Sequence, residues 1–289
     1  MKYFLILTAS FTSFICLAAC NNNKNNAADT IPKNVNNKSS ATNLSTIAAI
    51  APPNNFNVEP QGGNSFGAWL QLQTLKADKT VYLHNGTIKP YQGGSYAVVN
   101  ISVPKQDVQQ CADALMRMRA EYFYSQKAYD KITFKSVDGP YMAFSDYIKG
   151  KRWRDVRDKL TSYNVAPIST TNNNDELRKG FDNYLFLVFS FCNTYSLNLQ
   201  ASNNIATENI QVGDFFIRGG FPGHAVLCVS TAVNQQGERV AMFAQSYMPA
   251  QSIHIVLNPK NSSPWFALNK NEGISYTEYT FKSNEAKTW

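Results

Sequence analysis

The sequence predicts an α+β domain in which an antiparallel meander of strands carries two long helices packed on one face. Two segments, 104–126 and 172–197, repeat apolar residues at steps of three and four, the period of a helix laid on a core. After Gly213 the period changes to two, in four short segments joined by loops that contain glycine or proline. Strands joined by short loops pair as neighbours, so the two observations together indicate a meander covered by helices.

Strands are predicted before the first long helix. Residues 80–91 hold an Asn-Gly pair between apolar residues, which is the strongest short hairpin signal. Residues 94–103 alternate, so one strand face carries Ala97, Val99, Ile101 and Val103. In the first helix we expect Asp107 to be the N-cap, and the apolar stripe consists of Val108, Cys111, Ala112, Leu115, Met118 and Tyr122.

The remaining elements follow in chain order. Residues 131–139 predict a short strand, and the second helix comes next. Its stripe consists of Leu177, Phe181, Tyr184, Val188, Phe191 and Tyr195. The four segments of period two read "GDFFIRG", "HAVLCVSTAV", "ERVAMFAQSY" and "QSIHIVL". They predict four consecutive antiparallel strands.

The first 62 residues are expected to lie outside this domain. Residues 1–19 are typical of a secretory signal, because a largely apolar run follows Lys2 and is too short for a spanning helix. The run ends in "LAAC", which predicts lipidation of Cys20; the alternative is an ordinary secreted protein in which Cys20 is incidental. Residues 20–62, rich in Asn and Ser, predict a disordered tether of roughly 35 Å. Residues 63–289 then form one globular domain.

Net charge and cysteine spacing limit the classes of partner and cofactor that the protein is expected to bind. The net charge is +7, and the one local cluster of cations, 149–159, interleaves Asp155 and Asp158, which indicates a solvated face with local ion pairs. Such a surface suits anionic lipids or acidic glycans, and no nucleic-acid module is present. No Cys/His spacing indicates a metal, and we expect no cofactor.

His224 is the candidate for catalytic chemistry. It follows a loop with three glycines, Gly219, Gly220 and Gly223, which either lets a substrate approach or only makes a turn. If residues 234–237 are a four-residue loop, Val233 lies opposite Glu238. Counting back then places His224 and Gln245 on the same face as diagonal neighbours, within reach of the Gln amide. An amide that fixes the ring is what a catalytic imidazole needs, although a strand-end histidine bonded to loop carbonyls is an equal alternative.

One of three cysteines is a candidate nucleophile for this histidine. Cys228 lies about 13 Å along the same strand and is too far away. Cys192 lies late in its helix, where burial and the helix dipole disfavour a thiolate. Cys111, near a helix start, is left, although a buried apolar role is the favoured alternative. His254 is expected to be exposed, because it faces away from its two isoleucine neighbours.

Four motifs carry a family resemblance: "DVQQCADALMRMRAEYFY", "GGFPGHAVLCVSTAVN", "AQSYMPAQSIHI" and "SPWFAL". Over 66–281 the chain resembles an uncharacterised family of bacterial lipoproteins classed as a domain of unknown function. It also resembles, more distantly, the papain-like cell-wall hydrolases of the NlpC and CHAP type. That second resemblance implies a papain-like sheet with Cys111 as nucleophile, His224 as base and Gln245 as the orienting residue. Cys111 lacks the usual Asp-Cys-Ser setting, and it precedes His224 by 113 residues, more than such domains need.

Two functions follow as expectations for a lipid-anchored protein of the bacterial cell envelope, facing the periplasm or the cell exterior. The first is a binding or structural module for cell-wall glycan or peptide, with aromatic contacts from Trp69, Trp153, Trp265 and Tyr247. The alternative is a papain-like cysteine hydrolase of amide bonds in peptidoglycan or peptides. In it, substrate would contact Gly220, Gly223 and Tyr247. Rapid alkylation of Cys111 at neutral pH would favour the hydrolase.

Overall fold

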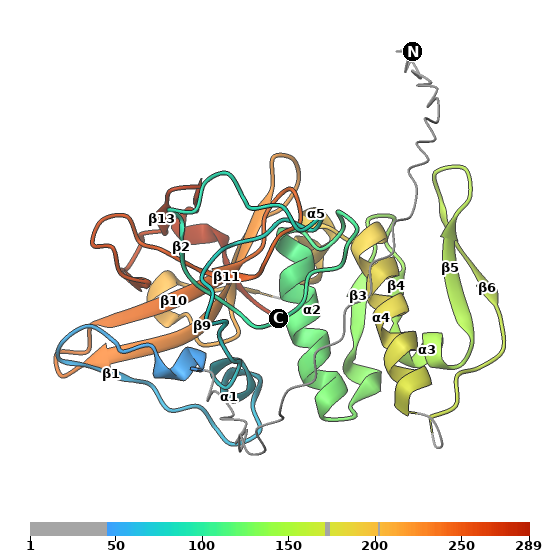
Figure 1. Cartoon of the computed structure of the whole chain (residues 1–289), viewed down its shortest axis with the longest axis horizontal. Helices are drawn as coiled ribbons and strands as arrows, with labels where there is room; N and C mark the ends of the chain where they lie inside the picture. The colour runs from blue at the N-terminus through green and yellow to red at the C-terminus, as the bar shows by residue number, and fades with distance from the viewer. Residues whose placement is uncertain (1–44, 171–173, 202) are drawn as a thin grey trace, which may run out of the picture. The chain divides into compact units, whose positions relative to one another are not determined.

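A nine-stranded antiparallel sheet forms the centre of the fold (Figure 1). The computed structural model describes residues 45–170, 174–201 and 203–289. The strand order is β2-β11-β10-β9-β8-β15-β7, with β1 paired to β9 and β12 paired to β10. These strands are β1 (Phe56–Val58), β2 (Ser95–Val98), β7 (Asn203–Asn204), β8 (Phe215–Arg218), β9 (His224–Asn234), β10 (Arg239–Gln245), β11 (His254–Val256), β12 (Trp265–Ala267) and β15 (Ala286–Thr288). The predicted α+β class is confirmed.

The predicted meander consists of β8, β9, β10 and β11, each paired with the next along the chain. The expected pairing of Val233 with Glu238 is wrong, because Val233 lies opposite Arg239. A β-bulge farther along the hairpin shifts the register by one residue, so that Phe243 lies opposite Cys228. Beyond the bulge the two strands therefore have the register that the sequence argument assumed.

Both faces of the sheet are covered, which explains the uninterrupted apolar run of β9. On the face covered by α2, β9 contributes Ala225, Leu227 and Val229 to the larger core cluster. On the opposite face, Val226 and Cys228 enter a smaller cluster. Segments that follow β11 complete this smaller cluster with Phe266, Leu268, Ile274, Tyr276 and Phe281.

The two predicted long helices take different positions. α2 (Cys111–Ser125) packs on β9 and β10, as expected. α4 (Asn174–Phe191) packs on α2 and on α3 (Phe144–Ile148), so it lies farther from the sheet than α2 does (Figure 1). The apolar stripe of α4 is thus buried mainly between helices.

The start of α2 differs from the prediction. Gln110 is the N-cap, so Cys111 is the first helical residue. Asp107 does not cap the helix, because its Oδ1 accepts a hydrogen bond from the Ala250 amide (2.7 Å). The correction moves the thiol to the helix terminus itself.

The folded unit begins earlier than residue 63. η1 (Ile47–Ala49) and β1 lie inside the segment predicted to be a tether, and Ile47 is fully buried. Phe56 lies opposite Asn234, at the far end of β9. Isolated apolar residues that fill gaps in a distant sheet leave no local period, so the sequence could not reveal them. The predicted signal, Cys20 and residues 20–44 of the predicted tether lie outside the described residues.

Smaller elements surround this core. They are α1 (Phe66–Gln71), α5 (Thr194–Gln200), η2 (Tyr129–Lys131), η3 (Thr207–Asn209), η4 (Ser283–Glu285) and the pairs β3 (Thr133–Lys135) with β4 (Tyr141–Ala143), β5 (Lys151–Asp155) with β6 (Leu160–Asn164) and β13 (Ser275–Tyr276) with β14 (Tyr279–Thr280). The predicted hairpin near residue 85 is present as a bridge between Tyr82 and Ile88. Among the residues that the structure describes, no helix has the length and apolar character to cross a membrane.

Candidate functional site

His224 is the first residue of β9, and its side chain is fully buried. The loop before it needs glycine for conformational reasons at two positions. Gly220 has a φ of +100°, and a Cβ on Gly223 would lie 2.3 Å from the Gly220 carbonyl oxygen. The turn into β9 therefore accounts for both glycines, and their contact with a substrate stays a prediction.

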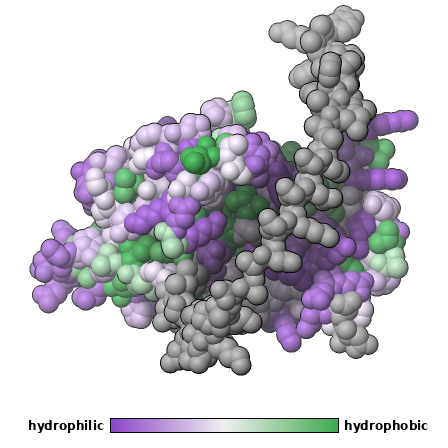
Figure 2. Space-filling model, in the orientation of Figure 1, coloured by the Kyte–Doolittle hydropathy of each residue, from purple (hydrophilic) through white to green (hydrophobic). Residues whose placement is uncertain are grey.

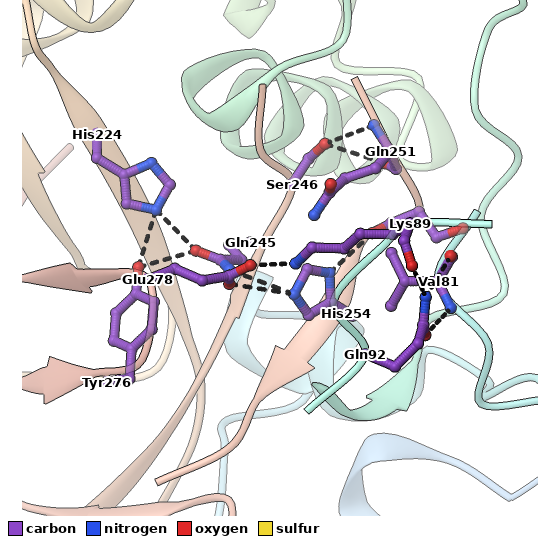
Figure 3. Close-up of polar contacts among 11 residues, drawn as sticks. Val81, Lys89, Gln92, His224, Gln245, Ser246, Gln251, His254, Tyr276 and Glu278 are labelled. Carbon is purple, nitrogen blue, oxygen red and sulfur yellow. Dashed lines mark hydrogen bonds and ion pairs between the residues drawn. The ribbon is translucent and has the colours of Figure 1, made fainter. Parts of the chain in front are cut away.

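Gln245, the last residue of β10, contacts the His224 ring. His224 Nε2 lies 2.7 Å from Gln245 Oε1 (Figure 3). The two side chains share a face of the sheet, as the register argument predicted. The predicted contact is correct because the β-bulge shifts the register by one residue, which cancels the one-residue error in the pairing predicted for Val233.

The Gln245 amide has one orientation that satisfies its neighbours. Its Nε2 donates to Glu278 Oε2 (2.5 Å) and to His254 Nε2 (3.2 Å) (Figure 3). A carboxylate has no proton to donate, so the amide nitrogen must face Glu278. Glu278 also forms an ion pair with Lys89, and both side chains are one-tenth exposed. This buried pair thus leaves the amide oxygen facing His224.

His254 favours the same orientation of the Gln245 amide, and its burial contradicts the prediction that it is exposed. The residue was expected to be exposed, but it is fully buried, because β11 is covered on both faces. Its Nδ1 donates to the Ser252 carbonyl oxygen (2.9 Å), so Nε2 carries the lone pair. That lone pair can accept only from the amino group of Gln245.

The tautomer of His224 follows from these contacts. Gln245 Oε1 is an acceptor, so His224 Nε2 must carry the proton, since two acceptors 2.7 Å apart would repel. The Tyr276 hydroxyl lies 2.8 Å from both atoms and donates to Gln245 Oε1. His224 Nδ1 then holds a lone pair, and this atom is buried without a hydrogen-bond partner among the described residues. The site contains a fixed neutral imidazole with one unused basic nitrogen.

Burial keeps both histidines neutral. Desolvation lowers the pKa of His224 to about 4, against the opposing effects of the Gln245 hydrogen bond and the Glu278 charge. Desolvation also lowers the pKa of His254 to about 4, while its bond to Ser252 acts the other way. At neutral pH neither ring carries a charge.

Cys111 begins α2, the helix that packs on β9. Burial raises the pKa of its thiol to about 12, the Asp113 carboxyl adds to this effect, and the amides of Ala112, Ala225 and Cys111 itself lower the pKa by less. The predicted lowering of this pKa by the helix start is wrong, because desolvation outweighs the amides. Within the described residues, no hydrogen bond joins the thiol to the His224 ring.

Neither of the other two thiols fits the role of nucleophile. Burial raises the pKa of Cys192 above its usual range, and burial raises that of Cys228 well above it. Cys228 points into the smaller cluster, and its thiol donates only to the Ser230 carbonyl oxygen (3.7 Å). Both are apolar core residues, as the sequence favoured, and all three cysteines are free.

Two tyrosine rings cover His224. The ring centroids of Tyr247 and Tyr279 lie 4.9 Å and 4.8 Å from that of the imidazole. Phe221, in the preceding loop, is 96% exposed. With these rings in place the imidazole is closed to solvent.

The predicted glycan-contact aromatics do not gather on one surface. Trp153 and Trp265 are buried in the core, which contradicts a contact role for either. Trp69 is half-buried and lines a groove of about 260 Å³ with the polar side chains Gln73, Asn100, Ser102, Arg117 and Glu121. A second groove of about 490 Å³ shares Ser102 and Arg117 with it.

Sequence reasoning missed the residues that orient Gln245. Lys89, Glu278 and Tyr276 lie more than 30 residues from Gln245 along the chain and belong to no motif. Only the alternation of "YTEY" (276–279), with Tyr276 inward, offered a weak signal. Across 45–170, 174–201 and 203–289, no group of histidine, cysteine or acidic residues has a metal-binding arrangement.

Comparison with known proteins gives one match. A protein-family model described as "Domain of unknown function (4846)" matches residues 47–288. No curated protein and no solved structure matches the chain.

Proposed function

The chain belongs to the family described as domain of unknown function (4846), and from that premise and the geometry at His224 we propose that it is a cysteine hydrolase of amide bonds. The observation that carries the proposal is the buried, unpartnered Nδ1 of His224. A buried acceptor without a partner is unfavourable, so its presence calls for a functional reason. Cys111 is the proposed nucleophile, and Gln245 orients the base.

The proposed reaction begins from a neutral pair. As Cys111 Sγ attacks the substrate carbonyl carbon, its proton passes to His224 Nδ1, and the imidazolium that forms keeps its Nε2–H bond to Gln245. The imidazolium then protonates the leaving amine nitrogen as the C–N bond breaks, which leaves a thioester on Cys111. Water, deprotonated by Nδ1, cleaves the thioester to a carboxylic acid and restores the thiol. Gln245 and Glu278 both raise the pKa of His224, so both favour the charged intermediate.

Gln109 is the proposed donor to the carbonyl oxygen in the transition state. It lies two residues before Cys111, it is fully buried, and in the part of the chain that the structure describes its Nε2 has no hydrogen-bond partner. Its Oε1 accepts from Arg117, which fixes the amino group on the other side of the amide. A fixed, desolvated donor is well suited to stabilise developing negative charge.

Substrate entry requires the site to open. We propose that the Tyr247 ring moves aside and that the backbone of the substrate passes along Gly220, where a Cβ would have no neighbour within 4 Å. The exposed Phe221 would then contact the substrate at the rim.

The test compares Cys111→Ala and His224→Ala with Cys192→Ala. Cys192 is the matched control, because both thiols are 4% exposed. Peptidoglycan fragments and peptides serve as substrates, and mass spectrometry detects new amine and carboxyl termini. We expect both site variants to lose at least about 10³-fold in rate and the control to keep its activity. Full activity in Cys111→Ala would reject the assignment.

The Trp69 groove supports a second candidate function, the binding of cell-wall glycan or peptide. An aromatic face beside amide and charged side chains is the combination that small-molecule sites use to orient polar ligands. We expect Trp69→Ala to weaken binding of disaccharide-peptide fragments by at least about tenfold in calorimetry. Trp153→Phe, at a buried tryptophan, is the control. Equal affinity of Trp69→Ala and the wild type would exclude this groove.

We also propose that lipid on Cys20 holds the chain to a membrane of the bacterial cell envelope, with the domain in the periplasm or at the cell exterior. The "LAAC" sequence that ends in Cys20 supports this. Metabolic labelling with palmitate is expected to mark the wild type and not Cys20→Ser. Label in both proteins would contradict the assignment.

A further inference from the structure

The β5–β6 hairpin stands apart from the sheet. Its two strands pair only with each other, and Figure 1 shows the hairpin at the edge of the domain opposite the nine-stranded sheet. Trp153 anchors its base, because this side chain is buried and stacks on Tyr147 at 6.5 Å. From Arg154 to Lys159 every residue is exposed. The tip therefore projects from the domain with its side chains open to solvent, and the Leu160 amide beside it donates to Asp138 (2.9 Å).

Positive charge is concentrated on this projection. Residues 149–164 contain six lysines and arginines and two aspartates, a net charge of +4 in a chain of net charge +7. In the part of the chain that the structure describes, the predicted ion pairs of Asp155 and Asp158 with these cations do not form. Asp155 instead accepts from the Asp158 amide (2.9 Å). Arg157 and Lys159 are left without a salt bridge in these described residues.

The turn at the tip holds an arginine in an unfavourable conformation. Val156 and Lys159 exchange two backbone hydrogen bonds, of 2.9 Å and 3.3 Å. Between them Arg157 and Asp158 have φ values of 55° and 60°. Asn-Gly is the usual pair for such a turn, because other side chains disfavour positive φ. Strained residues at a surface tip point to a function for the side chain that they present.

Apolar side chains lie among the cations. Val156 and Tyr163 are 40% and 43% exposed, and Arg154 lies over the Tyr163 ring at 5.1 Å. Figure 2 shows hydrophilic side chains projecting from this edge with hydrophobic residues among them. Tyrosine and basic residues together favour the interface between lipid head groups and water, whereas a soluble polyanion would gain nothing from an exposed valine.

We propose that the β5–β6 hairpin docks the domain on an anionic phospholipid surface. Arg154, Arg157 and Lys159 bind the lipid phosphates, and Val156 and Tyr163 enter the head-group layer. This contact is separate from the site at His224 and from lipid on Cys20.

The test uses the full chain with Cys20→Ser, which removes any lipid, and vesicles of phosphatidylcholine with or without phosphatidylglycerol. The triple variant Arg154→Gln, Arg157→Gln and Lys159→Gln is compared with a control triple variant that loses the same charge at exposed lysines, namely Lys260→Gln, Lys270→Gln and Lys282→Gln. We expect the hairpin variant to lose about 100-fold in partitioning to anionic vesicles, and the control far less. Val156→Ser is expected to weaken binding without changing its salt dependence.

Three results would overturn the proposal. Equal losses in the two triple variants would mean that only net charge matters. Equal binding of the wild type to neutral and anionic vesicles would exclude lipid phosphate. Binding to an anionic glycan that depends on the hairpin, with no binding to vesicles, would assign the surface to glycans. A steep fall in wild-type vesicle binding with rising salt supports the proposal without any variant.

Discussion

Glu278→Gln is the perturbation that most directly tests how the site is organised. In the wild type the Glu278 carboxylate accepts from Gln245 Nε2 and binds Lys89. The variant side chain offers one oxygen and one amino group in place of two oxygens. If the amide oxygen of the new glutamine accepts from Lys89, its amino group faces Gln245. The Gln245 amide must then rotate by about 180° to present its oxygen to that amino group. The turned amide would donate to His224 Nε2 and move the ring proton to Nδ1.

The size of the effect follows from the hydrogen bond that is lost. A hydrogen bond to a charged group contributes about 1.5–3 kcal/mol, so the other amide orientation in the wild type has a population of about 0.6–7%. With a neutral amide in place of the Glu278 carboxylate the preference loses this contribution and keeps those of His254 and Tyr276, so the second His224 tautomer gains population. Lys89 also loses its counter-charge, which we expect to lower the free energy of unfolding by about 1–3 kcal/mol.

The assay is nitrogen-15 NMR of the histidine rings. The chain has only three histidines, so the ring signals are assigned by replacing each in turn. The wild type is expected to show the proton of His224 on Nε2 and that of His254 on Nδ1. In Glu278→Gln the two His224 nitrogen signals should move toward each other, a change that mere loss of stability does not produce.

Glu285→Gln is the matched control. Glu285 forms an ion pair with Arg218 Nε (2.5 Å), and Arg218 lies opposite His224 in the sheet. The control therefore loses an ion pair near the site without touching Gln245. An Nδ1–H signature for His224 in the wild type, or unchanged ring signals in Glu278→Gln, would refute the reasoning.

Three further predictions concern acid stability, thiol reactivity and the domain boundary. The pKa of His224 and of His254 is lowered to about 4, so between pH 6.5 and 4 the unfolded chain binds more protons than the folded one. Urea denaturation should therefore show the free energy of unfolding falling by on the order of 3 kcal/mol per histidine as the pH is lowered from 6.5 to 4. A flat profile would contradict burial of the neutral rings. Since the thiol pKa of Cys111 is raised to about 12, its alkylation rate should still be rising at pH 10, and a plateau below pH 8 would mean that a thiolate exists at rest. Ile47→Ala should cost about 2–5 kcal/mol in urea unfolding because the side chain is fully buried, whereas Ile88→Ala, at a 59% exposed position, should cost under about 0.5 kcal/mol; equal effects would place residue 47 outside the core.

The contact between His224 and Gln245 could be predicted because strand register converts sequence distance into spatial distance. The prediction assumed an unbroken ladder, and the strands instead contain a bulge that restores the assumed register beyond it. No local signal announces a bulge of this kind. The contact was therefore predictable, but the pairing at Val233 was not.

His254 and the segment 45–62 escaped prediction for a shared reason. Alternation assigns one face of a strand to solvent only if that face is uncovered, and here residues after β11 cover it. The buried role of Ile47 likewise depends on a sheet whose strands come from the far end of the chain. Both errors arose because distant segments, invisible in a short window, decide what is buried.

The pairing of β1 with β9 also means that β1 is synthesised well before its partner strand. Phe56 lies opposite Asn234, so β1 waits for roughly 180 further residues before its partner exists. At the usual rate of synthesis, about 5–20 residues per second, this delay is about 10–35 s. During that interval the leading edge of the domain has no native partner. A chain that leaves the ribosome in this order keeps its N-terminal end open until β9 has been made.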